Sequence, residues 1–350
     1  QGLNASLSVD SVNILHLELL SALEKKTRTN YGAGLKQFTQ FCNNLQIPEP
    51  SHMPASDALL TAFLAHWQGR TACRTVDNWL TSLHFWHTLN GTPWRGDALV
   101  RIICEAVSKA VPMSSVWPRW PPVSLEHMHA LHSGLNLTNS FDTAVYACTC
   151  VTFWSVCQLG ELVILSAGLT NPHYHVLQTA KLQFHTIVGS IEYATLPIPW
   201  MKTTQQNGAV IIISHLDDPT SPIPALRHHL SANAAIPDIA PFFTFKMASG
   251  GWAPLTRTWF LDCCNIIWTE FGLQSVTSHS FCISGATELL LCGMPPDVVI
   301  IQGHWKSHAF LDYWHRIEQI IPLFITNSFD CSHLELVRTS MNRFQCKYSS

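Results

Sequence analysis

The sequence has little charge. Only 12% of its 350 residues are Asp, Glu, Lys or Arg, about half of the ~25% that is typical of a soluble domain. Lys and Arg together number 20 against 23 acidic residues, so the formal net charge is −3. Judged on charge alone, this balance excludes a strongly basic nucleic-acid-binding protein. The 47% of hydrophobic residues excludes an intrinsically disordered chain.

Several diagnostic patterns are also missing. The chain does not open on a basic and then apolar leader, so we expect no signal peptide. The longest apolar run, 144–157, is shorter than the ~20 residues of a membrane-spanning helix. None of the 12 cysteines forms a Cys-x-x-Cys pair, which argues against a zinc ribbon. Glycine-rich phosphate loops and Gly-x-Ser-x-Gly motifs are absent. We therefore expect an intracellular protein with free thiols and with no membrane, metal or cofactor.

Helical periodicity dominates the first third of the chain. Apolar residues recur every three or four positions from Tyr31 to Phe41, with Thr27 as the predicted N-cap. Further helices are predicted from Ser56, over about 75–90 and over about 97–110. We interpret residues 1–26 as an N-terminal extension and residues 27–110 as a helical domain. Four prolines within 111–123 cannot continue a helix, so this segment is a predicted linker.

The remainder combines helices with a few short strands. An apolar helix is predicted over 141–157, after one capped by Ser124. Segments rich in β-formers at 184–188, 193–198 and 209–213 predict a small antiparallel sheet. Further helices are predicted at 222–233, 256–272, 280–292, 296–302 and 307–320. The fold class is therefore mainly α with a small antiparallel β-sheet, with a second domain over 124–335 and a tail over 336–350.

Two groups of histidines have spacings that could hold a metal. His127, His129 and His132 lie near a predicted helix start, and His84 and His87 are three residues apart on a predicted helix. No carboxylate or cysteine completes a site nearby in the sequence. Surface or half-buried histidines are the favoured interpretation, and metal binding is the alternative.

Five short motifs follow one another in a specific order. They are Val-Cys-Gln-Leu-Gly-Glu-Leu at 156–162, Pro-Trp-Met-Lys-Thr at 199–203, His-Ser-Phe-Cys at 279–282 followed by Gly-Ala-Thr, Gln-Gly-His-Trp at 302–305, and Tyr313. Together they resemble the tyrosine recombinase (phage integrase-like) family, whose members break and rejoin DNA. They are most similar to its eukaryotic mobile-element branch, which includes fungal DNA breaking-rejoining enzymes. The resemblance implies a helical, SAM-like DNA-binding domain followed by an integrase-like catalytic domain.

The resemblance also implies a mechanism. Tyr313 would attack the scissile phosphate and form a 3′-phosphotyrosine. Lys202 would protonate the leaving 5′-oxygen with help from His279, while Trp305 would pack at the phosphate. Glu161 and His304 would occupy supporting positions. Double-stranded DNA is the implied partner, with possible self-association on DNA and a nuclear or other intracellular location.

The chain departs from the family pattern at both catalytic arginine positions. Gln158 replaces the first arginine, and Cys282 replaces the second. Neither side chain carries a positive charge or a planar fork at neutral pH. Loss of one preorganised donor typically costs ~10²–10³ in rate. The sequence therefore predicts a degenerate active site, and it leaves open whether the protein is an active enzyme.

A few basic residues are candidates for contact with DNA outside that site. The resemblance favours this role for small clusters that would otherwise be solvated surface: Lys25, Lys26, Arg28, Lys36, Arg70, Arg74 and Arg227. With so few cations, we expect weak binding and a shallow salt dependence.

Two other functions remain open. The chain could be a DNA-binding protein that keeps the recombinase fold without cutting DNA, or a structural protein of the same architecture without a nucleic-acid partner. A covalent adduct with nicked DNA would favour the recombinase, and absence of duplex binding at low salt would favour the structural protein.

A prediction about the gene follows from the identity of the replacements. Cytosine deamination in CGN arginine codons yields Gln, His, Cys or Trp, and the resemblance would place arginines at Gln158, Cys282 and His304. We expect a decayed mobile-element gene in which these three codons are each one transition away from CGN. Sequencing the gene checks this, and codons that lie further from CGN would contradict it.

Overall fold

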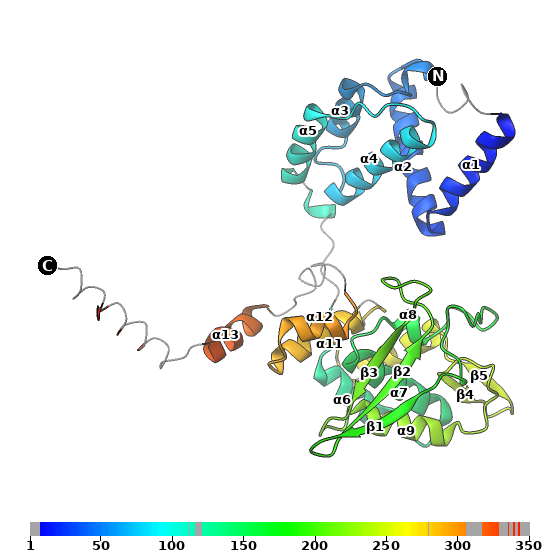
Figure 1. Cartoon of the computed structure of the whole chain (residues 1–350), viewed down its shortest axis with the longest axis vertical. Coiled ribbons are helices and arrows are strands. Elements are labelled where there is room, and N and C mark those ends of the chain that lie inside the picture. Colours follow the sequence, from blue (N-terminus) through cyan, green and yellow to red (C-terminus); the bar gives the residue numbers. More distant parts are fainter. Residues whose placement is uncertain are drawn as a thin grey trace. The chain divides into compact units, whose positions relative to one another are not determined.

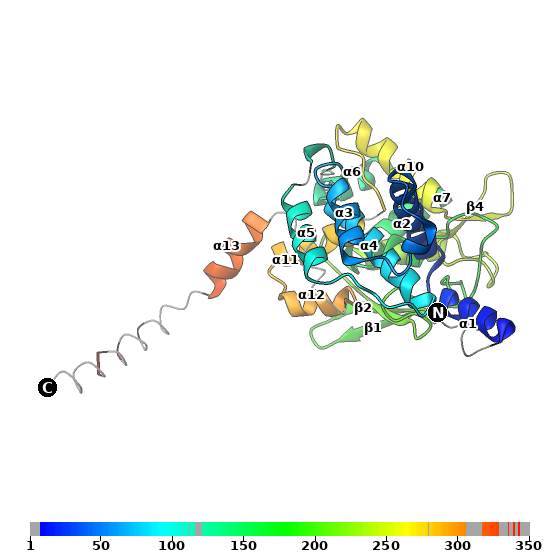
Figure 2. The same cartoon turned by 90° about the horizontal axis from the view of Figure 1, so that it is seen from above.

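The computed structural model describes residues 8–110, 112–115, 121–278, 280–305 and 317–328, with isolated positions at 335, 339, 342 and 343. Contacts between Cα atoms divide the chain into two units, Gln1–Arg119 and Trp120–Ser350. Figures 1 and 2 show the helices and strands of the two units. Each unit has a hydrophobic core of its own. None of the helices in the described residues is both long and apolar enough to cross a membrane.

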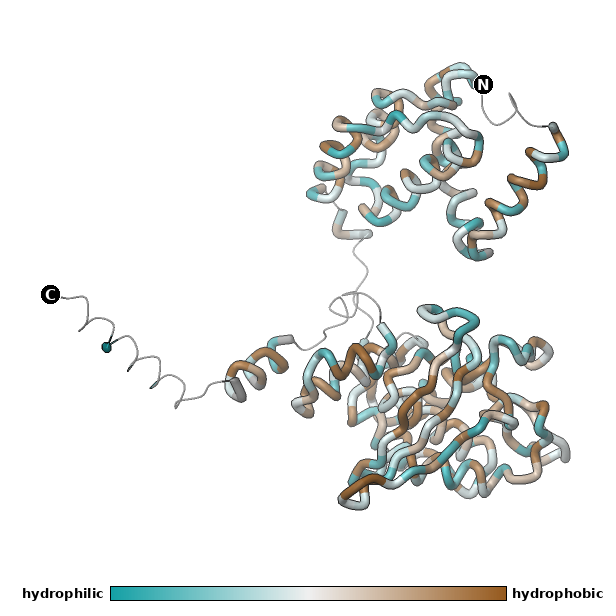
Figure 3. Tube along the Cα trace, in the orientation of Figure 1, coloured by the Kyte–Doolittle hydropathy of each residue, from teal (hydrophilic) through white to brown (hydrophobic). Residues whose placement is uncertain are grey.

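The described residues of the first unit form helices and the loops that connect them, without a strand. Phe38, Phe63 and Leu83 from three successive helices form its fully buried centre, and the rings of Phe38 and Phe63 meet edge-on at 5.3 Å. Apolar and polar residues alternate along these helices (Figure 3), as amphipathic helices around one core require. The elements are α1 (Val9–Ser21), α2 (Lys25–Asn44), η2 (Glu49–Ser51), α3 (Asp57–His66), α4 (Cys73–Leu89), α5 (Ala98–Lys109) and η3 (Met113–Ser115).

The second unit is built around helix α7, in which every residue from Thr143 to Phe153 is buried. This confirms the predicted core helix. The elements before the sheet are α6 (Leu125–Gly134), α7 (Ser140–Trp154) and α8 (Leu159–Leu162). Those after it are α9 (Pro222–Ala232), β4 (Thr244–Lys246), β5 (Trp252–Pro254), α10 (Arg257–Glu270), α11 (Ser280–Leu291), α12 (Pro296–Gln302) and α13 (Ile317–Ser328).

The predicted three-stranded sheet is confirmed. Strands β1 (Gln183–Ile187), β2 (Ile191–Ile198) and β3 (Ala209–Ser214) are antiparallel and lie in chain order. Thr195 of β2 pairs with Gln183 on one side and with Ile212 on the other. Successive side chains of a strand point to opposite faces of the sheet. One face, which includes Leu196 of β2 and Ile211 of β3, is buried in the same core as α7.

Helix α11 approaches α7 very closely at Gly285. A Cβ atom at this position would collide with the carbonyl oxygen of Phe153. Helix α12 lies beside α11 (Figures 1 and 2). Between them Gly293 has φ +84°, and its N–H bonds the carbonyl of Leu290, as expected of a glycine that ends a helix.

Three details differ from the sequence predictions. Helix α2 begins at Lys25 with Glu24 at its N-cap, so Thr27 is not the cap and lies in the first turn. Helix α7 ends at Trp154, three residues earlier than predicted, because Val156 adopts φ +55° and leaves the helical path. The β4–β5 hairpin was not predicted, since three-residue strands give too short a pattern.

The α7–α11 crossing predicts a specific sensitivity to side-chain size. We expect Gly285→Ala to lower the free energy of unfolding by about 1–3 kcal/mol, because the added methyl group overpacks the helix crossing. Urea denaturation measures this value. Gly168→Ala is the matched control, since a Cβ there meets nothing within 4 Å and should change stability by less than ~0.5 kcal/mol. Equal stabilities of the two variants would contradict the prediction.

Candidate active site

The chain makes a sharp turn between α7 and α8. Val156 has φ +55°, a conformation that is rare for a β-branched residue. Its N–H bonds the Phe153 carbonyl oxygen at 3.2 Å, and its side chain is buried in a cluster with Leu290 and Val299. Such a conformation costs on the order of 1–3 kcal/mol and persists only when surrounding contacts hold it. The contacts that hold Val156 in this conformation therefore also fix the position of Gln158 at the start of α8.

Gln158 and Glu161 are linked through the backbone at the start of α8. The Gln158 N–H donates a hydrogen bond of 2.9 Å to Oε2 of Glu161. Glu161 is only 5% exposed, whereas Gln158 is exposed. Glu161 is thus a buried carboxyl group that fixes the backbone of Gln158, the residue that the resemblance places at the first arginine position.

Cys282 comes to the same turn from α11. Its thiol donates a hydrogen bond of 3.0 Å to the carbonyl oxygen of Val156. Burial, with a smaller effect from the charge of Glu161, raises the pKa of the Cys282 thiol to about 12. The thiol is therefore neutral at pH 7. Cys282 ties α11 to the turn but brings no charge to it.

Burial also controls the carboxyl group of Glu161. It raises the pKa of Glu161 to about 7, and the hydrogen bond from the Gln158 N–H opposes the shift only in part. Within the described part of the chain, Glu161 has no ion-pair partner among Lys, Arg or His. The acid at this turn consequently lacks the cation that would hold it ionised.

His304 and Trp305 follow α12 and also lie near this region. Trp305 packs against the cluster that contains Val156. Burial lowers the pKa of His304, although a hydrogen bond with the Val210 backbone opposes the shift. The Gln302 side chain donates to the Ile212 carbonyl oxygen at 2.8 Å. The end of α12 is thereby attached to β3, the strand that follows the loop carrying Lys202.

The structure brings only some of the predicted catalytic residues together. Lys202 is exposed between β2 and β3, and within the described residues no ion pair joins its amine to Glu161. His279 and Tyr313 lie outside the described residues. The observed group is therefore Gln158, Glu161 and Cys282, with Trp305 packed nearby.

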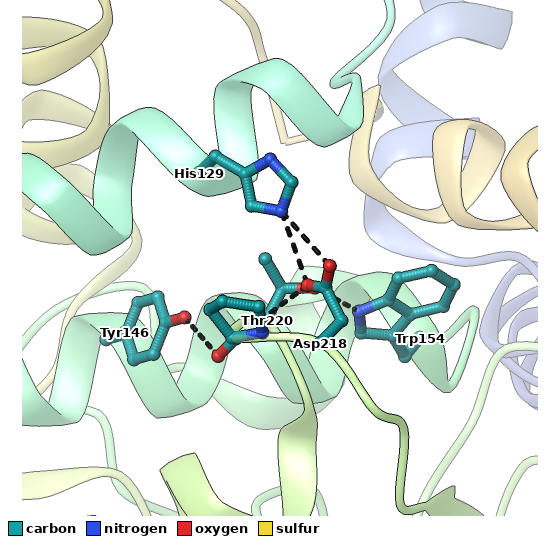
Figure 4. Close-up of polar contacts among 6 residues, drawn as sticks. His129, Tyr146, Trp154, Asp218 and Thr220 are labelled. Carbon is teal, nitrogen blue, oxygen red and sulfur yellow. Dashed lines mark hydrogen bonds and ion pairs between the residues drawn. The ribbon is translucent and has the colours of Figure 1, made fainter.

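A polar network supports the end of α7 just before the turn (Figure 4). The Trp154 indole N–H donates to Oγ1 of Thr220 at 3.2 Å, and the Thr220 N–H donates to Asp218. His129 Nε2 lies 3.2 Å from the same carboxylate. Partial burial raises the pKa of Asp218, but hydrogen bonds from Thr220 and His129 outweigh it, so the net shift is downward. Tyr146 completes the support by donating to the Pro219 carbonyl oxygen at 2.8 Å.

Two of the histidines considered as metal ligands, His87 and His127, make structural hydrogen bonds. His87 Nε2 accepts the Ala55 N–H at 2.9 Å, while Nδ1 donates to the Leu83 carbonyl oxygen. Burial is the main reason for the lowered pKa of His87, and likewise of His127 in the N-terminal cap of α6. Within the described residues, no three His, Cys, Asp or Glu side chains gather as a metal site.

The basic residues predicted to contact DNA are dispersed. Lys26, Arg28 and Lys36 are exposed on α2, and Arg70 and Arg74 are exposed around the start of α4. The side chain of Lys25 lies outside the described structure. On the second unit, Arg227 lies 3.7 Å from Glu192 and stacks over Phe184 at 4.1 Å, so its charge is partly neutralised.

One cation beside the site had no signal in the sequence. Arg257, the first residue of α10, places its guanidinium against Gly160 of α8. The two residues are almost a hundred positions apart, and only the tertiary structure brings them together. Neither local periodicity nor the five motifs indicate this contact.

The raised pKa of Glu161 predicts a pH effect on stability. Between pH ~4.5 and ~7 the folded protein keeps a proton that the unfolded chain has lost. Stability should therefore fall as pH rises through this window, by about 3 kcal/mol. We expect Glu161→Gln to remove this fall, as measured by urea denaturation at pH 5 and pH 8.

Comparing the native protein with Glu161→Gln separates the effect of Glu161 from that of groups whose contribution to stability rises with pH. Burial lowers the pKa of His229 to about 4, and its contribution is the same in both proteins. Glu270→Gln, at an exposed position, is the matched control. If the native protein and Glu161→Gln lose the same stability between the two pH values, the carboxyl group is not responsible.

The sequence has no match among protein-family models or curated proteins, but solved structures match it. The pre-cleavage complex of the XerH site-specific recombinase with difH is 13% identical, with a TM-score of 0.53, covering 96% of this chain and 85% of that one. The Tn1549 transposon integrase bound to transposon right-end DNA is 12% identical, with a TM-score of 0.50, covering 91% of this chain and 99% of that one. These likenesses confirm the predicted fold class. The chain has the tyrosine recombinase fold.

Proposed function

We propose that this chain is a tyrosine recombinase-like DNA breaking-rejoining protein of mobile-element origin with a degenerate active site. One observation carries the proposal. Gln158 and Cys282 are more than a hundred residues apart, yet both are tied to the Val156–Glu161 turn. These are the two positions at which the family resemblance expects arginine. Their convergence supports a site once built to hold one phosphate between two guanidiniums.

The chemistry would proceed by transesterification. The Tyr313 hydroxyl would attack phosphorus, forming the phosphotyrosyl bond as the bond to the 5′-oxygen breaks. Lys202 would protonate that oxygen, and His279 would assist the proton transfers. Negative charge would grow on the two non-bridging oxygens. In this chain neither the Gln158 amide nor the neutral Cys282 thiol can compensate that charge, so we expect severe loss of rate.

The same observation favours the alternative function of a DNA-binding protein that no longer cuts. Because a thiol with a pKa of about 12 stands in one arginine position and an amide in the other, the site lacks two charges needed for cleavage. Binding through dispersed cations does not require them. We further propose that the protein acts on double-stranded DNA, in the nucleus or elsewhere inside the cell, and that it self-associates on that DNA.

A nicked suicide substrate tests the proposal. We expect Gln158→Arg with Cys282→Arg to increase the covalent protein–DNA adduct by at least ~10²-fold over the native chain, because the two guanidiniums again bind the non-bridging oxygens. The gain need not equal the product of the single effects. Adduct formation is followed by denaturing electrophoresis, and adding Tyr313→Phe should abolish it.

Matched controls separate position from charge. Gln183→Arg with Gln274→Arg adds the same two charges at exposed positions outside the motifs and should leave the adduct unchanged. If the Gln158 and Cys282 replacements give a folded protein that binds DNA without any adduct, the non-cutting alternative is favoured. If no form of the protein binds duplex DNA at low salt, both proposals fail.

A further inference from the structure

The backbone of Arg257 is fixed beside the α8 segment. Thr256 caps α10 by accepting the Trp259 N–H on its hydroxyl at 3.3 Å. The Arg257 N–H donates to the Ile164 carbonyl oxygen at 2.9 Å, shortly after α8 ends. The cap fixes the start of α10, and the bond to Ile164 holds its first residue against the chain segment that follows Gln158 and Glu161.

The guanidinium of Arg257 lies directly on α8. A Cβ atom added to Gly160 would be 3.0 Å from Nη2 of Arg257, so the absence of a side chain at Gly160 leaves the room that the guanidinium occupies. Gly160 stands between Gln158 and Glu161. The tertiary structure therefore places one arginine at the turn where both expected arginines are missing.

This arginine has no partner to compensate it within the described part of the chain. Its Nε is buried and makes no hydrogen bond, and the ion pairs found there involve Asp218 and Glu192 instead. Among the described residues no ion pair joins it to Glu161 either, although Glu161 lies on the same short helix as Gly160. A buried donor without an acceptor is unfavourable.

The position on the helix adds a second unfavourable interaction. The N-terminus of a helix carries a partial positive charge, which disfavours a cation in the first turn. Arg257 is the first residue of α10, a helix of 14 residues. The Arg257 side chain thus has a buried donor without an acceptor among the described residues and a positive charge at the positive end of a helix. An anion bound from outside the chain would relieve both.

We propose that Arg257 binds a phosphate of the DNA backbone beside Gln158. A guanidinium pairs with phosphate through two parallel N–H donors, which suits a half-buried position. The proposal rests on the proposed function, since DNA is the anion that the site would meet. It assigns the contact to a residue outside the five motifs and outside the dispersed basic residues.

The test is the affinity of the full chain for a fluorescent mixed-sequence DNA duplex, measured by anisotropy over a range of salt concentrations. We expect Arg257→Gln to weaken binding at least about tenfold, the loss of one charge-assisted hydrogen-bonded contact. The slope of log affinity against log salt should become shallower by about 1. Arg257→Lys should keep the slope, because it keeps the charge, yet bind several-fold more weakly because it lacks the fork.

Lys246→Gln is the matched control. Lys246 is exposed on β4, and its backbone N–H lies near Ser140 at the opposite end of α7 from the Val156 turn. Removing this charge should leave affinity and salt slope unchanged. Thermal melting of each variant establishes that it is folded, and Arg257→Lys serves as the deciding variant if Arg257→Gln does not fold.

The outcomes separate the two proposals. If the native chain binds duplex DNA and the folded Arg257 variants bind equally well with the same salt slope, the role of Arg257 is overturned while DNA binding stands. If Arg257→Gln lowers the DNA affinity no more than Lys246→Gln does, the effect comes from overall charge, and the assignment of a phosphate contact to Arg257 is also overturned. If the native chain binds no duplex at low salt, DNA binding and the Arg257 contact fail together.

Discussion

The hydrogen bond from the Cys282 thiol to the Val156 carbonyl oxygen is the contact on which the candidate site depends. Val156 holds a left-handed conformation that a β-branched residue adopts only under constraint. One hydrogen bond contributes about 1 kcal/mol, so packing must supply the rest. Helix α11 reaches the turn because Gly285 lets it lie against the carbonyl of Phe153. Helix crossing, strained turn and thiol contact therefore form one unit.

The shortage of charged residues in the sequence has a local consequence at this turn. Among the described residues Glu161 is buried without an ion-pair partner, and burial raises its pKa to about 7. A guanidinium in place of the Cys282 thiol would favour the ionised carboxyl and lower that pKa. Under the proposed function, the same missing charge would leave a scissile phosphate uncompensated. The acid and the phosphate thus depend on one pair of absent cations, and Arg257 supplies a single charge beside them.

Much of the fold was predictable because its signals are local. Ser56 and Ser124 cap helices with their own side chains, and Gly293 ends α11 with a positive φ. The sheet followed from β-forming segments divided by turns. The predicted end of α7 was wrong, because residues 155–157 continue the apolar run of the helix before them. Val156 leaves the helical path with φ +55° and is buried in the cluster that contains Leu290, a contact that no local pattern indicates.

The sequence by itself determined the helical architecture, the small antiparallel sheet and the order of the motifs, since periodicity, capping and spacing act within a few residues. It also showed that neither expected arginine is present. The tertiary structure alone decided that Gln158 and Cys282 meet at one turn, that Glu161 is buried there, and that Arg257 lies on Gly160. Burial and charge proximity depend on segments far apart in the chain, and no local pattern encodes the distance between them.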